Sequence, residues 1–325
     1  MEIDSLDFFG YNADQLKVLN LLKEARADSK KPKKKLLLMT APSFVVDFDY
    51  MHFVPKMRGL GFDKVTELTF GAKVVNEHYH KYIHEHYASY VRPQKGKGKT
   101  KVKDKNFQDK FISSVCPTSV NLIMTKYPTL KHSLLPFDSP MGAMSKIARK
   151  NFPDHTIIFL APCSAKKLEA KTIIGKNKKP FIEAALTFAE MKQIVAKEKP
   201  APPLKGKEPQ LFDSFYNDYT KIYPLSGGLS KTLHAKSILL KKEIVSCDGC
   251  TDIIKLLQKN PHKVFYDILF CKGGCIGGPG IASHVPKFVR KRRVLNYRSK
   301  SDRESMHGMQ GLDKYTKGLD FSKKF

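Results

Sequence analysis

The sequence predicts an α/β fold of mostly parallel sheet flanked by helices. Short apolar runs, each long enough for one buried strand, alternate with stretches that carry helical spacing or helix-capping residues. Turn-forming residues follow several of these runs directly, as they do where parallel strands end. With 325 residues, 41% of them hydrophobic, the chain can bury one large domain or two lobes.

The first elements follow from capping residues and apolar patterning. Residues 12–26 predict an amphipathic helix, because Asn12 can cap it and leucines recur at helical spacing behind it. Residues 36–39 form a continuous apolar run that predicts a strand buried on both faces. A second strand–helix unit is expected around residues 60–65, with its helix reaching residue 87.

The middle of the chain repeats this arrangement after a break. Residues 92–106 are poor in apolar side chains and predict a basic insertion or linker. Cys116 then stands at a strand-to-helix turn, and the buried strand predicted at 155–160 leads directly into Cys163. A hydroxyl residue, Thr187, followed three positions later by Glu190 predicts a capped helix start.

The last predicted strand covers residues 264–270 and runs into a glycine-rich segment with two more cysteines, at 271–280. Residues 296–325 are polar and basic and predict a partly ordered C-terminal tail. We therefore expect one functional domain over residues 1–295, followed by this tail.

The chain is strongly basic, with 58 Lys and Arg against 31 Asp and Glu and a formal charge of +27. Much of the charge lies in short runs, at residues 30–35, 95–105 and 287–293, each flanked by loop-type residues. Solvated loops explain these runs, and the alternative is a basic docking surface for an anionic partner. An acidic electron carrier fits that alternative as well as a polynucleotide does, so nucleic acid is not favoured.

The expected location is the cytoplasm. The N-terminus lacks the basic start and apolar stretch of a secretion signal, and no apolar run approaches the length of a membrane span. In a reducing compartment, six cysteines indicate metal ligands or reactive thiols rather than disulfides.

The cysteines can be grouped in two ways. Cys247 and Cys250 with Cys271 and Cys275 have near zinc-ribbon spacing, which would make the chain a basic zinc protein. Alternatively, Cys116 and Cys163 join Cys271 and Cys275, since all four follow buried strands. Ligands collect at the carboxyl ends of parallel strands, and four thiolates gathered there could hold a 4Fe-4S cluster.

Glycines support the second grouping. The segment after the last predicted strand contains Gly273 and Gly274, with further glycines at 277, 278 and 280. These glycines would let the backbone approach an inorganic cluster and offer N–H groups to its sulfides.

Three segments, in order, resemble the signature segments of the iron-only (FeFe) hydrogenase catalytic domain. They are residues 113–117 (SSVCP), 162–169 (PCSAKKLE) and 271–275 (CKGGC) with its trailing glycines. The resemblance extends over roughly residues 35–295, with supporting stretches at 42–44, 61–65, 139–141 and 226–228.

The resemblance implies two lobes with the cluster in the cleft between them. It makes Cys116, Cys163, Cys271 and Cys275 the ligands of a 4Fe-4S cluster, with Cys275 also bridging to a two-iron carbonyl/cyanide subsite. Lys166 matches the family lysine that contacts a cyanide of that subsite. Ser139, Gly273 and Gly274 are expected beside the cofactor.

Departures from the family pattern bear on activity. Val115 stands where the enzymes have a proton-relaying cysteine, and no glutamate occurs between Glu85 and Glu169. A valine has no exchangeable proton, so fast hydrogen turnover is not expected. Lys272 replaces the usual proline, and the Gly-Gly-Pro-Gly ending at 277–280 resembles sensory branches of the family.

These observations predict an FeFe-hydrogenase-like iron-sulfur protein, with slow hydrogen chemistry or redox or hydrogen sensing as its role. The alternatives are an electron-transfer protein or iron-sulfur assembly scaffold on the same fold, and then the zinc-ribbon protein. The expected partners are a ferredoxin-like acidic electron carrier and, if the two-iron subsite is filled, hydrogenase maturation proteins. Cys247 and Cys250 have no assigned role.

Overall fold

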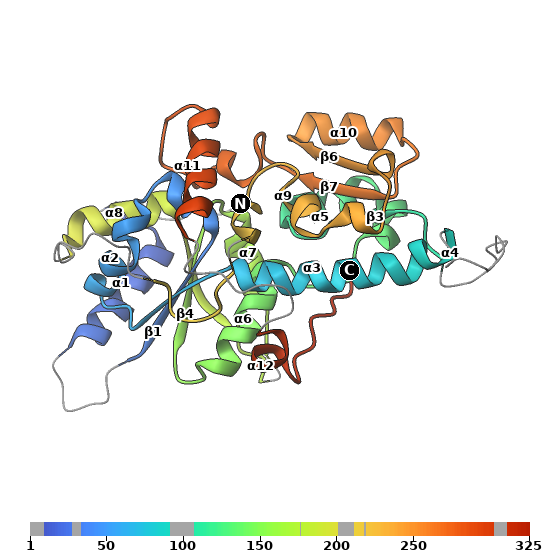
Figure 1. Ribbon diagram of the computed structural model, residues 1–325. Coiled ribbons are helices and arrows are strands. Elements are labelled where there is room, and N and C mark those ends of the chain that lie inside the picture. Colours follow the sequence, from blue (N-terminus) through green and yellow to red (C-terminus); the bar gives the residue numbers. More distant parts are fainter. Residues whose placement is uncertain are drawn as a thin grey trace.

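The computed structural model describes residues 10–27, 34–91, 107–175, 177–200, 211–217, 219–301 and 311–325. The strands within these ranges form two sheets, and their pairings are all parallel. Figure 1 shows the two sheets side by side, each with its own helices. The predicted α/β fold with two lobes of parallel sheet is thus confirmed. The insertion predicted at residues 92–106 lies outside the described residues.

The first sheet has the strand order β2-β1-β4-β5. Its strands are β1 (Leu36–Thr40), β2 (Lys64–Glu67), β4 (Thr156–Ala161) and β5 (Ile182–Thr187). The central strands β1 and β4 are buried almost throughout, as their apolar runs predicted. On one side of the sheet lie α1 (Ala13–Arg26), α2 (Tyr50–Leu60) and α8 (Phe188–Glu198), and α6 (Pro140–Asn151) contacts β4 from the other (Figure 1).

Both predicted helix starts are confirmed by their hydrogen bonds. The Asn12 side chain accepts from the N–H of Gln15, whose own side chain accepts from the N–H of Asn12, and α1 follows. Thr187 and Glu190 make the same reciprocal pair at the start of α8. Each pair satisfies two N–H groups that a helix end would otherwise leave without partners.

The second sheet has the strand order β3-β7-β6 and a core of its own. Its strands are β3 (Phe111–Ile112), β6 (Ile244–Asp248) and β7 (Phe265–Leu269). Apolar side chains of α5 (Pro117–Lys126) and α10 (Cys250–Lys259) pack against Ile112, Tyr266 and Ile268 of these strands. Figure 1 shows α10 beside β6 and β7.

One long helical segment joins the two lobes. It comprises α3 (Thr69–Ile83), the π-helical turn η2 (His84–Ala88) and α4 (Ser89–Val91), and in Figure 1 it runs from beside the first sheet to beneath the second. A Cβ at Gly71 would lie 2.5 Å from the carbonyl oxygen of Pro140, so only glycine lets α3 pack this closely on α6. At the other lobe, the Tyr79 hydroxyl lies 2.7 Å from the Ser114 hydroxyl.

A buried ion pair attaches α11 (Lys287–Lys300) to the first sheet. Lys221 Nζ lies 3.1 Å from a carboxylate oxygen of Glu67 at the end of β2, and both side chains are almost fully buried. The Tyr297 hydroxyl of α11 donates to Glu67 and accepts from Lys221, each at 2.8 Å. These hydrogen bonds compensate for taking two charges out of water.

Shorter helices complete the fold. They are α7 (Ala165–Thr172), α9 (Gly228–Thr232) and α12 (Leu312–Thr316), with the 3-10 turns η1 (Pro42–Val46), η3 (Pro128–Ser133), η4 (Tyr219–Ile222), η5 (Ala235–Ser237), η6 (Lys241–Glu243) and η7 (Gly274–Gly277).

The C-terminal residues contact the first lobe. The boundary expected between residues 295 and 296 falls inside α11. Beyond it, Leu312 and Phe321 are buried, and the Lys146 ammonium of α6 donates to the Asp320 carbonyl. Of the predicted tail, residues 296–300 belong to α11, and α12 contacts α6. Among the described residues, no helix combines the length and apolar character that crossing a bilayer requires.

Candidate metal centre

A cavity of about 80 Å³ lies where the carboxyl ends of strands from both sheets meet. The first sheet lines it with Ala41–Ser43 after β1, Leu68 and Thr69 after β2, and Pro162 and Cys163 after β4. The second sheet contributes Val115–Pro117 after β3 and, after β7, Cys275. The lining is mainly apolar, so charged groups inside would be shielded from water.

Three of the predicted cysteine ligands line this cavity, and the fourth lies next to them. Cys116 is the residue before α5, and Cys163 occupies the turn between β4 and α7. Cys271 and Cys275 follow β7, with Cys275 in η7. Electrostatic interactions link Cys116 and Cys163 to both Cys271 and Cys275. The fold therefore brings the four predicted ligands together from distant parts of the chain.

Burial and mutual proximity disfavour charge on these thiols. Burial raises the pKa of Cys271 to about 11, and the neighbouring Cys116 and Cys163 contribute to this rise. The same two causes raise the pKa of Cys275 well above its usual value, and burial raises that of Cys163. Four thiolates in such a place need a compensating positive charge, which bound iron would supply.

The glycine-rich segment after β7 holds its shape through backbone contacts. Gly274 has a φ of +76°, and a Cβ there would lie 2.4 Å from the Pro224 carbonyl oxygen. The N–H of Cys275 donates to that same carbonyl at 2.8 Å. The N–H of Gly280 donates to the carbonyl of Pro162, beside Cys163, also at 2.8 Å. Glycine is required here because the backbone segments approach so closely.

One part of the glycine expectation needs correction. The N–H of Gly273 donates to the Asp248 carboxylate at 2.7 Å, and that of Gly274 donates to the Cys271 carbonyl at 2.9 Å. Both groups already have protein acceptors, so they do not point free N–H groups at cluster sulfides. Gly273 and Gly274 both have a positive φ, and they form the turn that places Cys271 and Cys275.

Lys166 lies at the edge of the cavity in a network of polar contacts. Its ammonium donates to Glu169 at 2.6 Å and to the Val115 carbonyl and the Ser139 hydroxyl at 3.3 Å each. Burial alone would lower the pKa of Lys166, but the Glu169 carboxylate and the nearby cysteines raise it above its usual value. Lys166 is thus a charged donor beside the cysteines, and Glu169 and Ser139 hold it in place.

Two polar atoms from residues that were not among the predicted site residues also belong to the cavity. The hydroxyls of Ser43 and Tyr223 are buried and have no hydrogen-bond partner within the described ranges, and both residues line the cavity. A buried polar atom without a partner is costly, so these hydroxyls fit a site that receives a polar group. Ser43 follows a buried strand, which was a usable signal, whereas Tyr223 lies in a segment without periodicity.

Cys247 and Cys250 lie apart from the four-cysteine group. Cys250 lines a separate groove against α5, with Asn121 and Phe270. The groups that shift the pKa of Cys247 are Asp252, Asp248 and Lys272, and burial raises it most. In the part of the chain that the structure describes, no three His, Cys, Asp or Glu side chains converge on one metal position. Because Cys247 has no cysteine among the groups that shift its pKa, the zinc-ribbon grouping is not supported.

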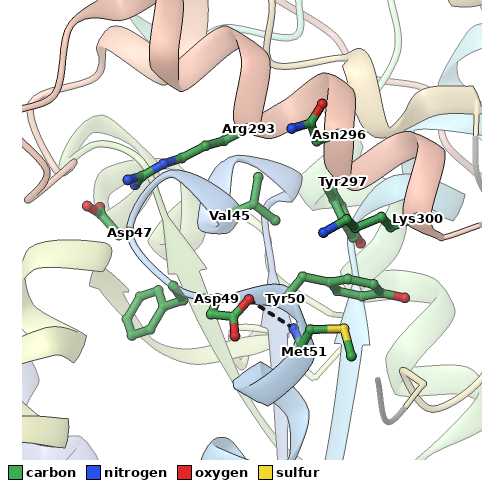
Figure 2. Close-up of a pocket in the computed structure, with 10 residues that line it drawn as sticks. Val45, Asp47, Asp49, Tyr50, Met51, Arg293, Asn296, Tyr297 and Lys300 are labelled. Carbon is green, nitrogen blue, oxygen red and sulfur yellow. Dashed lines mark hydrogen bonds between the residues drawn. The ribbon is translucent and has the colours of Figure 1, made fainter. Parts of the chain in front are cut away.

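A second hollow, of about 380 Å³, lies between α11 and the segment after β1 (Figure 2). Arg293, Asn296, Tyr297 and Lys300 reach it from one face of α11, because they recur at helical spacing. Asp49 lies on its opposite side, where its carboxylate caps α2 by accepting from the N–H of Met51. No cysteine lines this second hollow, and it is distinct from the cavity that the cysteines line.

Solved structures that share this fold include iron hydrogenases. The FeFe hydrogenase HydA(deltaEFG), from a study of stepwise H-cluster assembly, superposes with a TM-score of 0.69 at 13% identity, over 96% of this chain and 98% of its own. A variant of the FeFe hydrogenase HydA1 of Chlamydomonas reinhardtii superposes with a TM-score of 0.68 at 14% identity, over 95% and 98%. These similarities establish the fold.

Sequence comparison points the same way. Iron hydrogenase 1 of Clostridium pasteurianum is 22% identical over 289 residues, which cover 75% of this chain and 47% of the relative. The chain thus spans about half the length of that relative. The family described as the C-terminal domain of the iron-only hydrogenase large subunit matches residues 34–279. The chain therefore belongs to this family of iron-only hydrogenase domains, as a divergent member.

Proposed function

We propose that this chain is an iron-sulfur protein that binds a 4Fe-4S cluster through Cys116, Cys163, Cys271 and Cys275. The observation that carries the proposal is that three of these cysteines, from both sheets, line one mainly apolar cavity and that Cys271 lies next to them. A 4Fe-4S cluster, when bound, takes up and releases single electrons, and a two-iron carbonyl/cyanide subsite would add hydrogen chemistry. The role is slow hydrogen oxidation and proton reduction, or the sensing of hydrogen or redox state.

The side chains around the cysteines support a cofactor larger than the cluster alone. Lys166 offers an ammonium held by Glu169, and Ser43 and Tyr223 have buried hydroxyls without partners among the described residues. These donors suit anionic ligands such as cyanide, because charge-assisted hydrogen bonds are strong in an apolar pocket. Cys275, which lines the cavity itself, would bridge the cluster to the subsite.

Val115 supports a slow or sensory role. Its side chain is 6% exposed and lines the cavity, so an apolar surface stands where proton transfer would need a titratable group. The alternative is an electron-transfer protein or an assembly scaffold without the two-iron subsite. Val115 favours that alternative too, since neither role needs protons at the cavity.

Electrons would come from a ferredoxin-like acidic carrier. The first turns of α11 lie beside Cys271, where Lys287 contacts the Gly273 position and lowers the pKa of the Cys271 thiol against the effect of burial. Lys291 and Arg292 are exposed on the same helix. A cationic helix at the surface closest to a cluster ligand would draw an acidic partner to the place where electron transfer is shortest.

Metal analysis and infrared spectroscopy test the proposal. The full chain is coexpressed with the hydrogenase maturation proteins, purified without oxygen, and analysed for iron and zinc. About six irons with carbonyl and cyanide bands establish the complete centre, and about four irons without these bands support the electron-transfer or scaffold alternative. One zinc without iron would overturn the proposal.

A further inference from the structure

The second hollow is large enough to hold a small organic molecule. Its volume is about 380 Å³, which lies within the range of ligand sites in proteins. One wall is the face of α11 described above, and the other is formed by residues between Val45 and Met51 (Figure 2). That second wall follows the carboxyl end of β1, and α/β proteins bind ligands at the carboxyl ends of their strands.

The α11 wall presents hydrogen-bond donors with acceptors to spare. Asn296 and Lys300 make no hydrogen bond or ion pair with any residue that the structure describes, and the Arg293 guanidinium uses one of its N–H groups, on the Val46 carbonyl. Asn296 lies one helical turn from each of the other two, so all three share one face. We call Arg293, Asn296 and Lys300 the α11 donors. A guanidinium, an ammonium and an amide together suit an oxyanion such as a phosphate.

The opposite wall holds two carboxylates, of which Asp49 is the one open to a ligand. The two carboxylate oxygens of Asp47 accept from the N–H groups of Ala282 and Ser283, at 2.9 and 2.6 Å. Asp49 caps α2 and lies 2.6 Å from a ring nitrogen of His52, but its side chain is 60% exposed. Its remaining lone pairs can accept from ligand hydroxyls, as carboxylates do from the ribose of nucleotides.

The turn η1 separates the second hollow from the cavity that the cysteines line. Ser43, in the first part of this turn, lines the cavity, and Val45, near its end, lines the second hollow. The last residue of η1, Val46, accepts the hydrogen bond from Arg293. A ligand held by Arg293 would therefore act on a turn whose other side is part of the cavity.

A chain of hydrogen bonds makes a second connection between the two sites. Tyr297, which lines the second hollow, donates to the Glu67 carboxylate at 2.8 Å. The hydroxyl of Thr69 donates to the same carboxylate at 3.0 Å, and Thr69 lines the cavity. Exposed lysines are common on protein surfaces and would indicate nothing alone. Here the donors occur with a facing acceptor, a hollow of ligand size and two contacts that reach the cavity.

We propose that the second hollow binds a nucleoside monophosphate, with the phosphate on the α11 donors and the ribose hydroxyls on Asp49. The base lies against the apolar side chains after β1. Binding adds negative charge on the far side of η1 from the cavity, and negative charge disfavours the uptake of an electron. The ligand therefore lowers the reduction potential of the cluster. This effect on the cluster rests on the proposed function, whereas the binding does not.

Isothermal titration calorimetry of the full chain with its cluster tests the binding. The probes are adenosine monophosphate (AMP), inorganic phosphate and adenosine. We expect AMP to bind, and each of the other two to bind at least about tenfold more weakly, because each offers only part of the contacts. Lys300→Gln and Asn296→Ala should each weaken AMP binding about tenfold or more.

Arg298→Gln is the matched control. It removes one positive charge from the same helix, as Lys300→Gln does, but Arg298 is exposed outside the hollow, so AMP should bind as to the wild type. No binding of AMP to the wild type, or equal weakening in Lys300→Gln and Arg298→Gln, overturns the site. Inorganic phosphate that binds as tightly as AMP overturns the assignment of a nucleoside.

A redox titration followed by the visible absorption of the cluster tests the connection to the cavity. Saturating AMP should lower the reduction potential of the wild type and of Arg298→Gln, and the same AMP concentration should leave that of Lys300→Gln unchanged. AMP binding without a shift in the wild type overturns the connection. A chain without iron would overturn the proposed function, and calorimetry would still decide the binding, since no cysteine lines the second hollow.

Discussion

Cys116 and Cys247 lie in different surroundings, so their serine variants form a matched pair. Cys116 lines the cavity together with Cys163 and Cys275, whereas Cys247 has no cysteine among its electrostatic neighbours. We predict that Cys116→Ser loses the cluster, because a serine hydroxyl is a poor ligand for iron in this apolar place. Iron per chain should fall from about four or six to below one. Cys247→Ser should keep the full iron content, and equal loss in both variants would show that the assignment of ligands is wrong.

Val115 offers a test of proton supply. Its side chain lines the cavity, and its carbonyl accepts from Lys166, so a thiol of similar size at this position would fit without disturbing that contact. Val115→Cys should raise hydrogen turnover about tenfold or more if proton delivery limits the rate. Val115→Ala, which removes bulk but adds no exchangeable proton, is the control. An unchanged rate in Val115→Cys would place the limit at another step.

At the residue scale, the sequence predicts ligands better than their neighbours. Cys116 and Cys163 could be assigned because each follows a strand, and the carboxyl ends of parallel strands converge. The contact of Lys166 with Ser139 could be expected only from the family resemblance. The approach of Tyr223 to Cys275 depends on a loop without periodicity, so no local pattern predicts it.

Among the elements, α11 depends on a buried charge network. Its Tyr297 hydroxyl bonds to both members of the Glu67–Lys221 ion pair. Tyr297→Phe removes both bonds and leaves a buried charged pair short of a partner, which should cost about 1–3 kcal/mol of the free energy of unfolding. Denaturant unfolding measures this cost. Tyr315→Phe is the control, because the Tyr315 hydroxyl has no hydrogen bond within the described ranges, and a loss of similar size there would contradict the explanation.

Element prediction succeeded where burial on both faces leaves a continuous apolar run. β1, β4 and β7 were recognised for this reason, and the helix starts of α1 and α8 by their capping residues. β6 was missed because its residues are at most partly buried, whereas the strand before Cys116 was expected and is present as the two-residue β3. Tertiary pairing with β7, rather than local preference, makes these two segments strands.

For the whole molecule, the charge on α11 predicts salt-dependent electron transfer. Lys291 and Arg292 are exposed on the helix that begins beside Cys271. Replacing both with glutamate should slow reduction by an acidic ferredoxin about tenfold at low ionic strength, and the difference should shrink as salt is added. Lys23 and Lys192, exposed on α1 and α8, replaced in the same way are the control. Equal slowing in both double variants would indicate an effect of net charge rather than a docking surface.

The cysteines that meet at the cavity come from both lobes, with roughly a hundred residues between Cys163 and Cys271. A cluster bonded to all four would act as a covalent cross-link that divides the chain into closed loops. Such loops lower the entropy of the unfolded chain, so the folded state gains stability from the bonds that hold the iron. Unfolding and cluster loss then become one event, and the working lifetime of the protein is set by the chemistry that attacks the cluster, such as oxygen and chelators, more than by temperature.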